Sequence, residues 1–86
     1  MKIKVLKFSM KGCAPCVRLE KELEGLDITT VDILKNPEIR KKYSIRNVPV
    51  LIFEKNEKEV LRHVGFIPRQ KFEDLLREVN DNINKL

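Results

Sequence analysis

The chain has 86 residues, enough for one small domain but not for a second hydrophobic core, so we expect a single domain spanning residues 1–86. Its formal charge is +5, from 18 lysines and arginines against 13 aspartates and glutamates. The basic residues are interleaved with acidic ones and form no block containing aromatics, which argues against a nucleic-acid-binding protein. A mildly basic surface favours acidic protein partners instead.

Residues 2–7 alternate between charged and apolar side chains, which is not the pattern of a signal peptide. No run approaches the roughly 18 apolar residues that a membrane span needs. We therefore expect a cytoplasmic protein that does not contact a membrane. In that reducing compartment a C-x-x-C pair is more often catalytic or metal-binding than structural.

The first half of the chain predicts two strands separated by a helix. Residues 3–8 are rich in Ile, Val, Leu and Phe and predict the first strand. The helix runs from the cysteines to about residue 24, with apolar residues at spacings of three and four, and Gly25 ends it. The β-branched run within residues 28–33 predicts the second strand.

The second half predicts a short helix, a hairpin and a long helix. Asn36 caps the short helix, which ends near residue 43. Residues 50–53 and 59–64 predict two strands joined by a turn, and Pro68 opens the last helix. The apolar residues of that helix fall on one face: Phe72, Leu75, Leu76, Val79, Ile83 and Leu86.

The resulting order, β-α-β-α-β-β-α, predicts an α/β fold. The first two strands are joined through a helix and should be parallel, because such crossovers are right-handed connections within one sheet. The last two strands should be antiparallel.

Cys13 and Cys16 are the only cysteines, and they stand where the first strand gives way to the first helix. In the first turn of a helix, their Cα atoms would lie roughly 5 Å apart, inside the window of about 4.4–6.8 Å for a disulfide. The unpaired N–H groups of a helix start carry partial positive charge and favour ionisation of Cys13. Cys16 should be more covered and placed to attack a mixed disulfide formed by Cys13. Pro15 suits a first helical turn, since its missing N–H would have no partner there.

Two other interpretations of the cysteine pair are small buried hydrophobes and half of a metal site. A zinc site needs four ligands, and His63, the one other good candidate, belongs to a different element. We therefore expect redox chemistry and no bound metal.

Three features together resemble the thioredoxin superfamily, in the order in which that family carries them. They are Cys13-Ala14-Pro15-Cys16 after Phe8-Ser9, the segment Tyr43-Ser44-Ile45-Arg46-Asn47-Val48-Pro49-Val50, and Val64-Gly65. Over its whole length the chain is similar to a short thioredoxin- or glutaredoxin-like redoxin. The resemblance implies a thioredoxin-like fold with a four-stranded mixed sheet flanked by three helices.

The resemblance also implies a substrate-binding site beside the cysteines. Pro49 would follow a cis peptide bond, and the backbone of Val48 would present a short strand edge to a substrate peptide. Gly65 would leave room for the substrate backbone, with Ala14 and Pro15 adding contacts between the cysteines.

The chain departs from the family pattern at several positions. Lys7 stands where thioredoxins often have a buried Asp, and Gly12 replaces a Trp. We expect Lys7, as a strand residue, to extend its charged end into water. A second interpretation is that its positive charge favours formation of the thiolate. Phe66 replaces the second glycine of a glutaredoxin pair, and residues 65–68 resemble the Gly-Phe-x-Pro of redoxins that serve ribonucleotide reductase.

From these features we predict a monomeric protein-disulfide reductase in which Cys13 attacks a substrate disulfide and Cys16 releases the product. Its partners would be disulfide-containing proteins and an electron donor of the thioredoxin-reductase type, with no cofactor beyond the Cys13–Cys16 disulfide. The alternatives are a glutaredoxin-like redoxin coupled to glutathione or serving ribonucleotide reductase, and a non-catalytic binding module of the same fold. A weaker alternative is an iron–sulfur carrier dimer.

Overall fold

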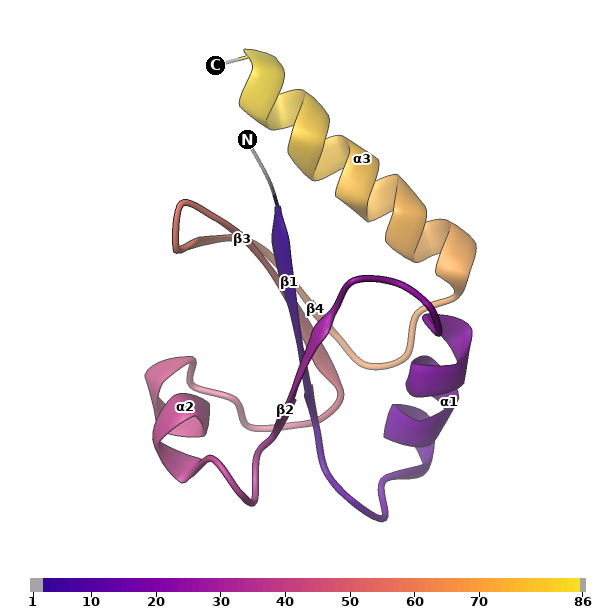
Figure 1. Cartoon of the computed structure of the whole chain (residues 1–86), viewed down its shortest axis with the longest axis vertical. Helices are drawn as coiled ribbons and strands as arrows, with labels where there is room; N and C mark the ends of the chain where they lie inside the picture. The colour runs from indigo at the N-terminus through magenta and orange to yellow at the C-terminus, as the bar shows by residue number, and fades with distance from the viewer. Residues whose placement is uncertain (1–2, 86) are drawn as a thin grey trace.

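The computed structural model describes residues 3–85, with side chains described for residues 3–81. Its seven elements follow the predicted order β-α-β-α-β-β-α and confirm the α/β fold (Figure 1). The elements are β1 (Lys4–Ser9), α1 (Ala14–Glu22), β2 (Thr29–Asp32), α2 (Pro37–Lys42), β3 (Val50–Lys55), β4 (Lys58–Val64) and α3 (Arg69–Lys85).

The four strands form one mixed sheet in the order β2-β1-β3-β4. β1 runs parallel to β2 and antiparallel to β3, and β3 runs antiparallel to β4. Both predicted strand directions are therefore confirmed. Because β1 is an inner strand, the segment that leaves its carboxyl end and carries the cysteines starts from the middle of the sheet.

Helices cover the two faces of the sheet unequally: α1 and α3 lie on one face and α2 on the other (Figure 1). Alternate side chains of a strand point to opposite faces, so each face has its own core. The core under α1 and α3 contains Val5, Leu19, Leu23, Leu51, Phe53, Ile67, Phe72 and Val79. The core on the α2 face contains Leu6, Phe8, Val31, Ile33, Ile45, Val50 and Ile52.

The last helix uses the predicted apolar face. Phe72 and Val79 are buried, and Leu75 and Leu76 pack against the same core. Ile83 lies outside the residues whose side chains are described, and Leu86 lies outside the described chain.

The hairpin between β3 and β4 turns through Asn56 and Glu57. Both residues have positive φ, 53° and 66°, which is the geometry of a two-residue type I′ turn. This turn matches the right-handed twist of the strands, and it allows β3 to extend to Lys55 and β4 to begin at Lys58.

The structure adds detail for three polar side chains that the sequence singled out. Asn36 is the N-cap residue of α2, as predicted, but its side chain makes no capping hydrogen bond; its amide donates to the carbonyl of Asp32 at 3.0 Å and so closes the loop that precedes the helix. His63 is half-buried, because it pairs with Leu51 in the sheet and lies on the face covered by α1 and α3. Only 6% of Lys7 is exposed, since it alternates with Val5 toward that same covered face. No buried side-chain nitrogen among the described residues lacks a hydrogen-bond partner, so the ammonium of Lys7, which makes no hydrogen bond there, keeps contact with solvent as expected.

Candidate redox site

The two cysteines sit at the start of α1 and form a disulfide, with their Cα atoms 5.2 Å apart. Cys13 is the N-cap of the helix, and its Sγ accepts a hydrogen bond from the backbone N–H of Cys16 at 3.3 Å. Gly12 has a φ of +83°, a conformation that glycine adopts without a steric penalty, and it turns the chain into the helix. The sulfur of Cys13 thus occupies the place of a capping oxygen, among amides that carry partial positive charge.

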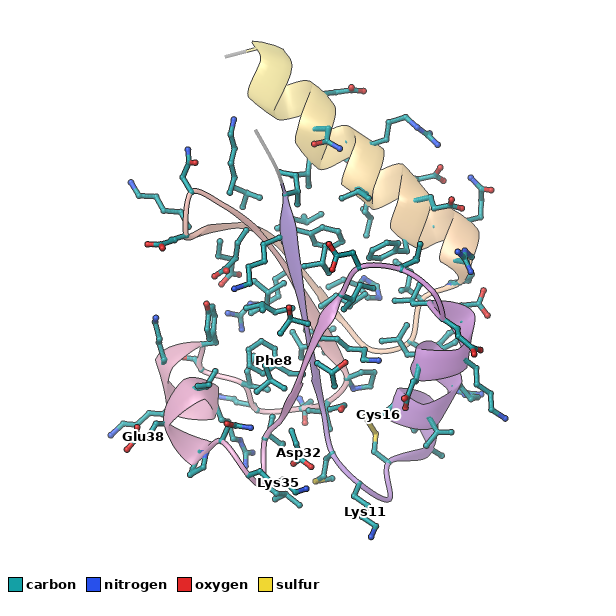
Figure 2. All side chains as sticks on the ribbon, viewed as in Figure 1. Phe8, Lys11, Cys16, Asp32, Lys35 and Glu38 are labelled. Carbon is teal, nitrogen blue, oxygen red and sulfur yellow. A yellow bond between two sulfur atoms is a disulfide. The ribbon has the colours of Figure 1, made fainter. Side chains whose placement is uncertain are left out.

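The two sulfur-bearing residues differ in exposure. Cys16 is 4% exposed, on the inner side of α1, whereas Cys13 is partly exposed. Figure 2 shows the pair at the end of the sheet where β1 leads into α1. A molecule approaching from solvent therefore meets Cys13 first, as expected from the sequence, and Cys16 lies behind it.

The loop before β3 reaches the disulfide through Val48 and Pro49. The peptide bond between these residues is cis, as the resemblance implied, and the Sγ of Cys13 lies 3.9 Å from the carbonyl oxygen of Val48. The N–H of Gly65 donates to the carbonyl of Pro49 at 2.8 Å. Three segments distant in sequence, around Cys13, Val48 and Gly65, are thereby brought to one end of the sheet.

Of the two residues between the cysteines, Ala14 is exposed and Pro15 is half-buried, in the first turn of α1. Val17 and Val64 are also exposed, by 49% and 57%. Val17 directly follows Cys16 in the chain and Val64 directly precedes Gly65, so each exposed valine is next in sequence to a residue of the candidate site. The sequence named Val64 only as part of the motif with Gly65 and did not name Val17, since an exposed valine cannot be distinguished from a core valine by residue type.

Arg18 and Phe66 form a contact that sequence reasoning also missed. The guanidinium of Arg18, on α1, lies over the ring of Phe66 at 5.2 Å from its centroid, within the range of a cation–π interaction. Phe66 follows Gly65, so this contact ties the outer side of α1 to the loop that passes the disulfide. The two residues are 48 positions apart in the sequence, so no local signal could have predicted the contact.

Basic residues stand near the disulfide on the same end of the sheet. Figure 2 shows Lys11 at the tip of the loop that precedes the cysteines and Lys35 on the neighbouring loop after β2. Both lysines are exposed. The nearby carboxylate of Asp32 accepts hydrogen bonds from the backbone N–H groups of Leu34 and Lys35, at 2.8 and 3.4 Å, and so serves to hold that loop.

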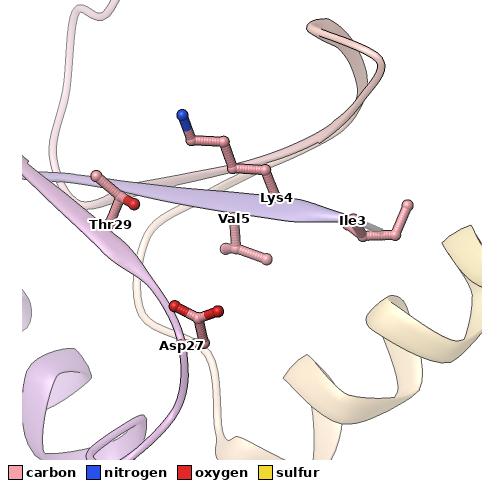
Figure 3. Close-up of a pocket in the computed structure, with 5 residues that line it drawn as sticks. All are labelled: Ile3, Lys4, Val5, Asp27 and Thr29. Carbon is pink, nitrogen blue, oxygen red and sulfur yellow. The ribbon is translucent and has the colours of Figure 1, made fainter. Parts of the chain in front are cut away.

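A pocket at the other end of β1 has no connection with this site. It has a volume of about 290 Å³ and lies around Lys4, Val5, Asp27 and Thr29, with Ile3 at its edge (Figure 3). The strand from Lys4 to Ser9 separates it from the cysteine loop. Its lining includes none of the residues that the sequence singled out.

Residues 3–85 contain neither a cluster of metal-ligating side chains nor a membrane-spanning helix. Nowhere in this range do three or more His, Cys, Asp or Glu side chains gather in a way that could hold a metal ion. The helices found there include none that is long and apolar enough to cross a membrane.

A four-stranded mixed sheet, a cysteine pair at a helix start and a cis proline opposite it define a thioredoxin-type redox protein. Residues 1–80 match the family model described as a thioredoxin-like domain, and the chain belongs to this family. Family membership and the disulfide-forming cysteines together support a thioredoxin-type redox function.

Relatives of known sequence agree with this assignment. The chain is 32% identical over 80 residues to the SPbeta prophage-derived thioredoxin-like protein YosR of Bacillus subtilis, covering 90% of this chain and 99% of the relative. It is 30% identical over 82 residues to a thioredoxin of Staphylococcus epidermidis, covering 86% and 79% of the two chains.

Solved structures also agree with the assignment to the thioredoxin-like family. Thioredoxin-2 of a malaria parasite superimposes with a TM-score of 0.81 at 26% identity, over 90% of this chain and 82% of the other. Fasciola hepatica thioredoxin gives a TM-score of 0.75 at 27% identity, over 90% and 80%.

Proposed function

We propose that this protein reduces disulfide bonds in other proteins through the dithiol of Cys13 and Cys16. The observation that carries the proposal is the unequal exposure of the two cysteines within one helical turn. An accessible sulfur at a helix start favours nucleophilic attack, and a covered sulfur within bonding distance favours release of the product.

The reaction has two displacement steps. The Cys13 thiolate attacks one sulfur of the substrate disulfide, the substrate S–S bond breaks, and the other substrate sulfur leaves as a thiolate that takes a proton from water. Cys16 then loses its proton and attacks Cys13, forming the Cys13–Cys16 disulfide and releasing the second substrate sulfur. Two electrons pass from the dithiol to the substrate, which leaves the protein oxidised.

The proposed substrate groove runs between Cys13, Val48 and Gly65. Val48 is partly exposed and precedes the buried Pro49, so its backbone groups offer a short edge with which an extended peptide can pair. The exposed valines beside it would contact apolar side chains of the peptide. Ala14 and Pro15 would line the same groove from the start of α1.

The direction of electron flow depends on how strongly the thiolate is stabilised. No histidine stands between the cysteines, so we propose a reductant that an electron donor of the thioredoxin-reductase type recharges. The similarity to proteins named thioredoxin supports this branch of the family. Recharging by thioredoxin reductase, but not by glutathione alone, would separate it from the glutaredoxin-like alternative.

The decisive experiment is to trap substrates with Cys16→Ser. This variant should stall at the mixed disulfide between Cys13 and a substrate, giving adducts that dithiothreitol releases and mass spectrometry identifies. The matched control is Cys13→Ser, which retains the covered Cys16 and should trap far less.

Equal trapping by the two variants, or none by either, would overturn the assignment of Cys13 as the nucleophile. Unchanged biological activity after replacement of both cysteines by Ser would favour the non-catalytic binding module instead.

A further inference from the structure

Arg18 is an exposed basic side chain that takes no part in the two displacement steps. Its guanidinium carbon lies 5.2 Å from the centroid of the Phe66 ring, and it makes no hydrogen bond or ion pair with any residue in the described part of the chain. A guanidinium carries five N–H donors in a planar arrangement that matches the two oxygens of a carboxylate. Within that part of the chain the donors of Arg18 are uncommitted, and they are available to an approaching molecule.

The ring of Phe66 holds this guanidinium in place. Phe66 is half-buried and packs against the core under α1 and α3, which restrains its ring. The guanidinium lies over the ring within cation–π range, and this contact restricts an otherwise flexible side chain. A side chain that is held in place before binding loses less conformational entropy when a partner arrives.

Arg18 lies beside the proposed substrate groove. It follows Ala14 by four positions and Pro15 by three, so the three residues share one side of α1. Phe66 directly follows Gly65, in the loop that passes α1 on its way from β4 to α3 (Figure 1). The contact between Arg18 and Phe66 therefore joins two of the segments that border the groove.

No neighbouring carboxylate among the described residues pairs with Arg18. Glu22 lies one turn further from the cysteines on the same side of α1, and its Oε2 accepts a hydrogen bond from the backbone N–H of Arg69 at 2.7 Å. Glu20 is exposed and makes no ion pair with Arg18. The first turn of α1, at the cysteine end, contains no acidic residue. A positive charge that no described carboxylate neutralises thus borders the groove, and it is complementary to an acidic group on a substrate.

We propose that Arg18 is a specificity-determining residue that binds an aspartate or glutamate of the substrate protein. The inference rests on the proposed function, in which an extended substrate segment pairs with the backbone of Val48 while Cys13 attacks its disulfide. Arg18 stands five positions after Cys13, about 7.5 Å along the helix. An extended peptide advances about 3.3 Å per residue, so the acidic residue lies roughly two or three positions from the attacked cysteine. Charge-assisted hydrogen bonds from the guanidinium to that carboxylate hold the segment, and they add no chemical step to the reaction.

The test uses peptides that carry one cysteine as a mixed disulfide with thiopyridine, so that attack by Cys13 on the peptide sulfur releases a chromophore. Each peptide has either Glu or Gln at the second or third position before or after its cysteine. We expect the reduced native protein to react about fivefold faster with the Glu peptide at one of these positions, the effect of a charge-assisted pair at a partly exposed site. Arg18→Gln should abolish this preference and leave the rate with the Gln peptide unchanged.

Further variants separate recognition by Arg18 from general attraction of charge. Arg18→Lys keeps the charge but not the planar donors, and it should lose most of the preference. A folded Phe66 variant, with Leu or Met, should also lower the preference, because the guanidinium is no longer held over a ring. The matched control is Lys21→Gln, which removes an exposed positive charge further along α1 and should leave the preference unchanged. Unfolding of the oxidised proteins by urea provides the folding check.

Equal rates for the Glu and Gln peptides with the native protein would overturn the proposal, as would a preference that persists in folded Arg18→Gln. Equal slowing of both peptides in Arg18→Gln would also contradict it, because Arg18 would then support the structure of the site and not its specificity. The proposed function fails by a different result, the absence of mixed disulfides with Cys16→Ser. The two failures are therefore distinguishable.

Discussion

At the scale of single residues, charge and hydrogen bonding on the α2 face are concentrated around Tyr43. Its hydroxyl donates to the Oε2 of Glu54 at 2.5 Å, and Glu54 is 6% exposed. This hydrogen bond, together with burial and the nearby carboxylates, raises the pKa of Tyr43 to about 12. Arg62 donates to the carbonyl of Tyr43 at 2.8 Å and to the carboxylate of Glu59, which raises the pKa of Arg62 and lowers that of Glu59.

We predict that Tyr43→Phe lowers the free energy of unfolding by about 1–3 kcal/mol at neutral pH, because the buried carboxylate of Glu54 loses its donor. The folded-state pKa of Tyr43 is about 12, above the unfolded value of about 10. This contribution is therefore complete below pH 10 and is lost as the pH rises toward 12. Urea unfolding at a series of pH values should show the native protein losing its advantage over Tyr43→Phe in that window.

Absorbance of tyrosinate gives an independent check, since Tyr43 is the only tyrosine in the chain. A midpoint near that of free tyrosine would contradict the hydrogen bond to Glu54.

At the scale of elements, the end of α1 is tied to the start of α3. The Oε2 of Glu22 accepts a hydrogen bond from the backbone N–H of Arg69 at 2.7 Å, and the guanidinium of Arg69 donates to the carbonyl of Glu24 at 3.3 Å. The first N–H groups of a helix have no partner within it and favour a negative charge nearby. Glu22 thus caps the start of α3 in place of a side chain from α3's own segment. The same hydrogen bond holds the end of α1, the helix that carries Cys16, against the start of α3.

We predict that Glu22→Ala lowers the free energy of unfolding by about 1 kcal/mol, the usual cost of losing a capping side chain. The matched control is Glu20→Ala, which removes an exposed glutamate of α1 that makes no hydrogen bond or ion pair with any described residue. Chemical denaturation of the oxidised proteins measures the free energy of unfolding of both variants. Equal losses in the two variants would attribute the effect to the charge of α1 and not to the contact with Arg69.

At the scale of the whole molecule, the net charge of +5 is most relevant where basic side chains adjoin the disulfide. Lys11 and Lys35 stand on neighbouring loops at that end of the sheet (Figure 2), and Arg46 is exposed in the loop that leads to Val48. A positive potential around the accessible sulfur would raise the rate of encounter with substrates that carry acidic residues beside their disulfide.

We predict that reduction of an acidic disulfide substrate slows several-fold between about 0.05 and 0.5 M salt, because the Debye length falls over this range, while an uncharged disulfide is unaffected. Lys35→Gln should weaken the salt dependence. The control is Lys58→Gln, which removes another exposed lysine, at the hairpin on the opposite end of the sheet. Steady-state rates of the three proteins measure this, and a salt response shared by the uncharged substrate would argue against steering.

The features that could be predicted from the sequence are those that depend on the spacing of residues within one segment of the chain. The spacing of Cys13 and Cys16 sets their separation through the geometry of a single helical turn, and alternation or helical spacing of apolar residues predicts each strand and helix. The order of elements and the motif around Pro49 then predict the fold. Strand and helix ends were less accurate, as with α1, which stops at Glu22, because a terminal residue is decided by the contacts of the chain that follows.

Only the tertiary structure decided which distant residues share a face. The sheet order brings Val48 against Cys13, Phe66 under Arg18 and Glu54 to Tyr43, and none of these contacts has a signature in its own segment. The burial of Lys7 is of the same kind. A lysine in a short strand is exposed along its length by default, and it is the packing of α1 over the inner strand β1 that leaves only 6% of Lys7 exposed.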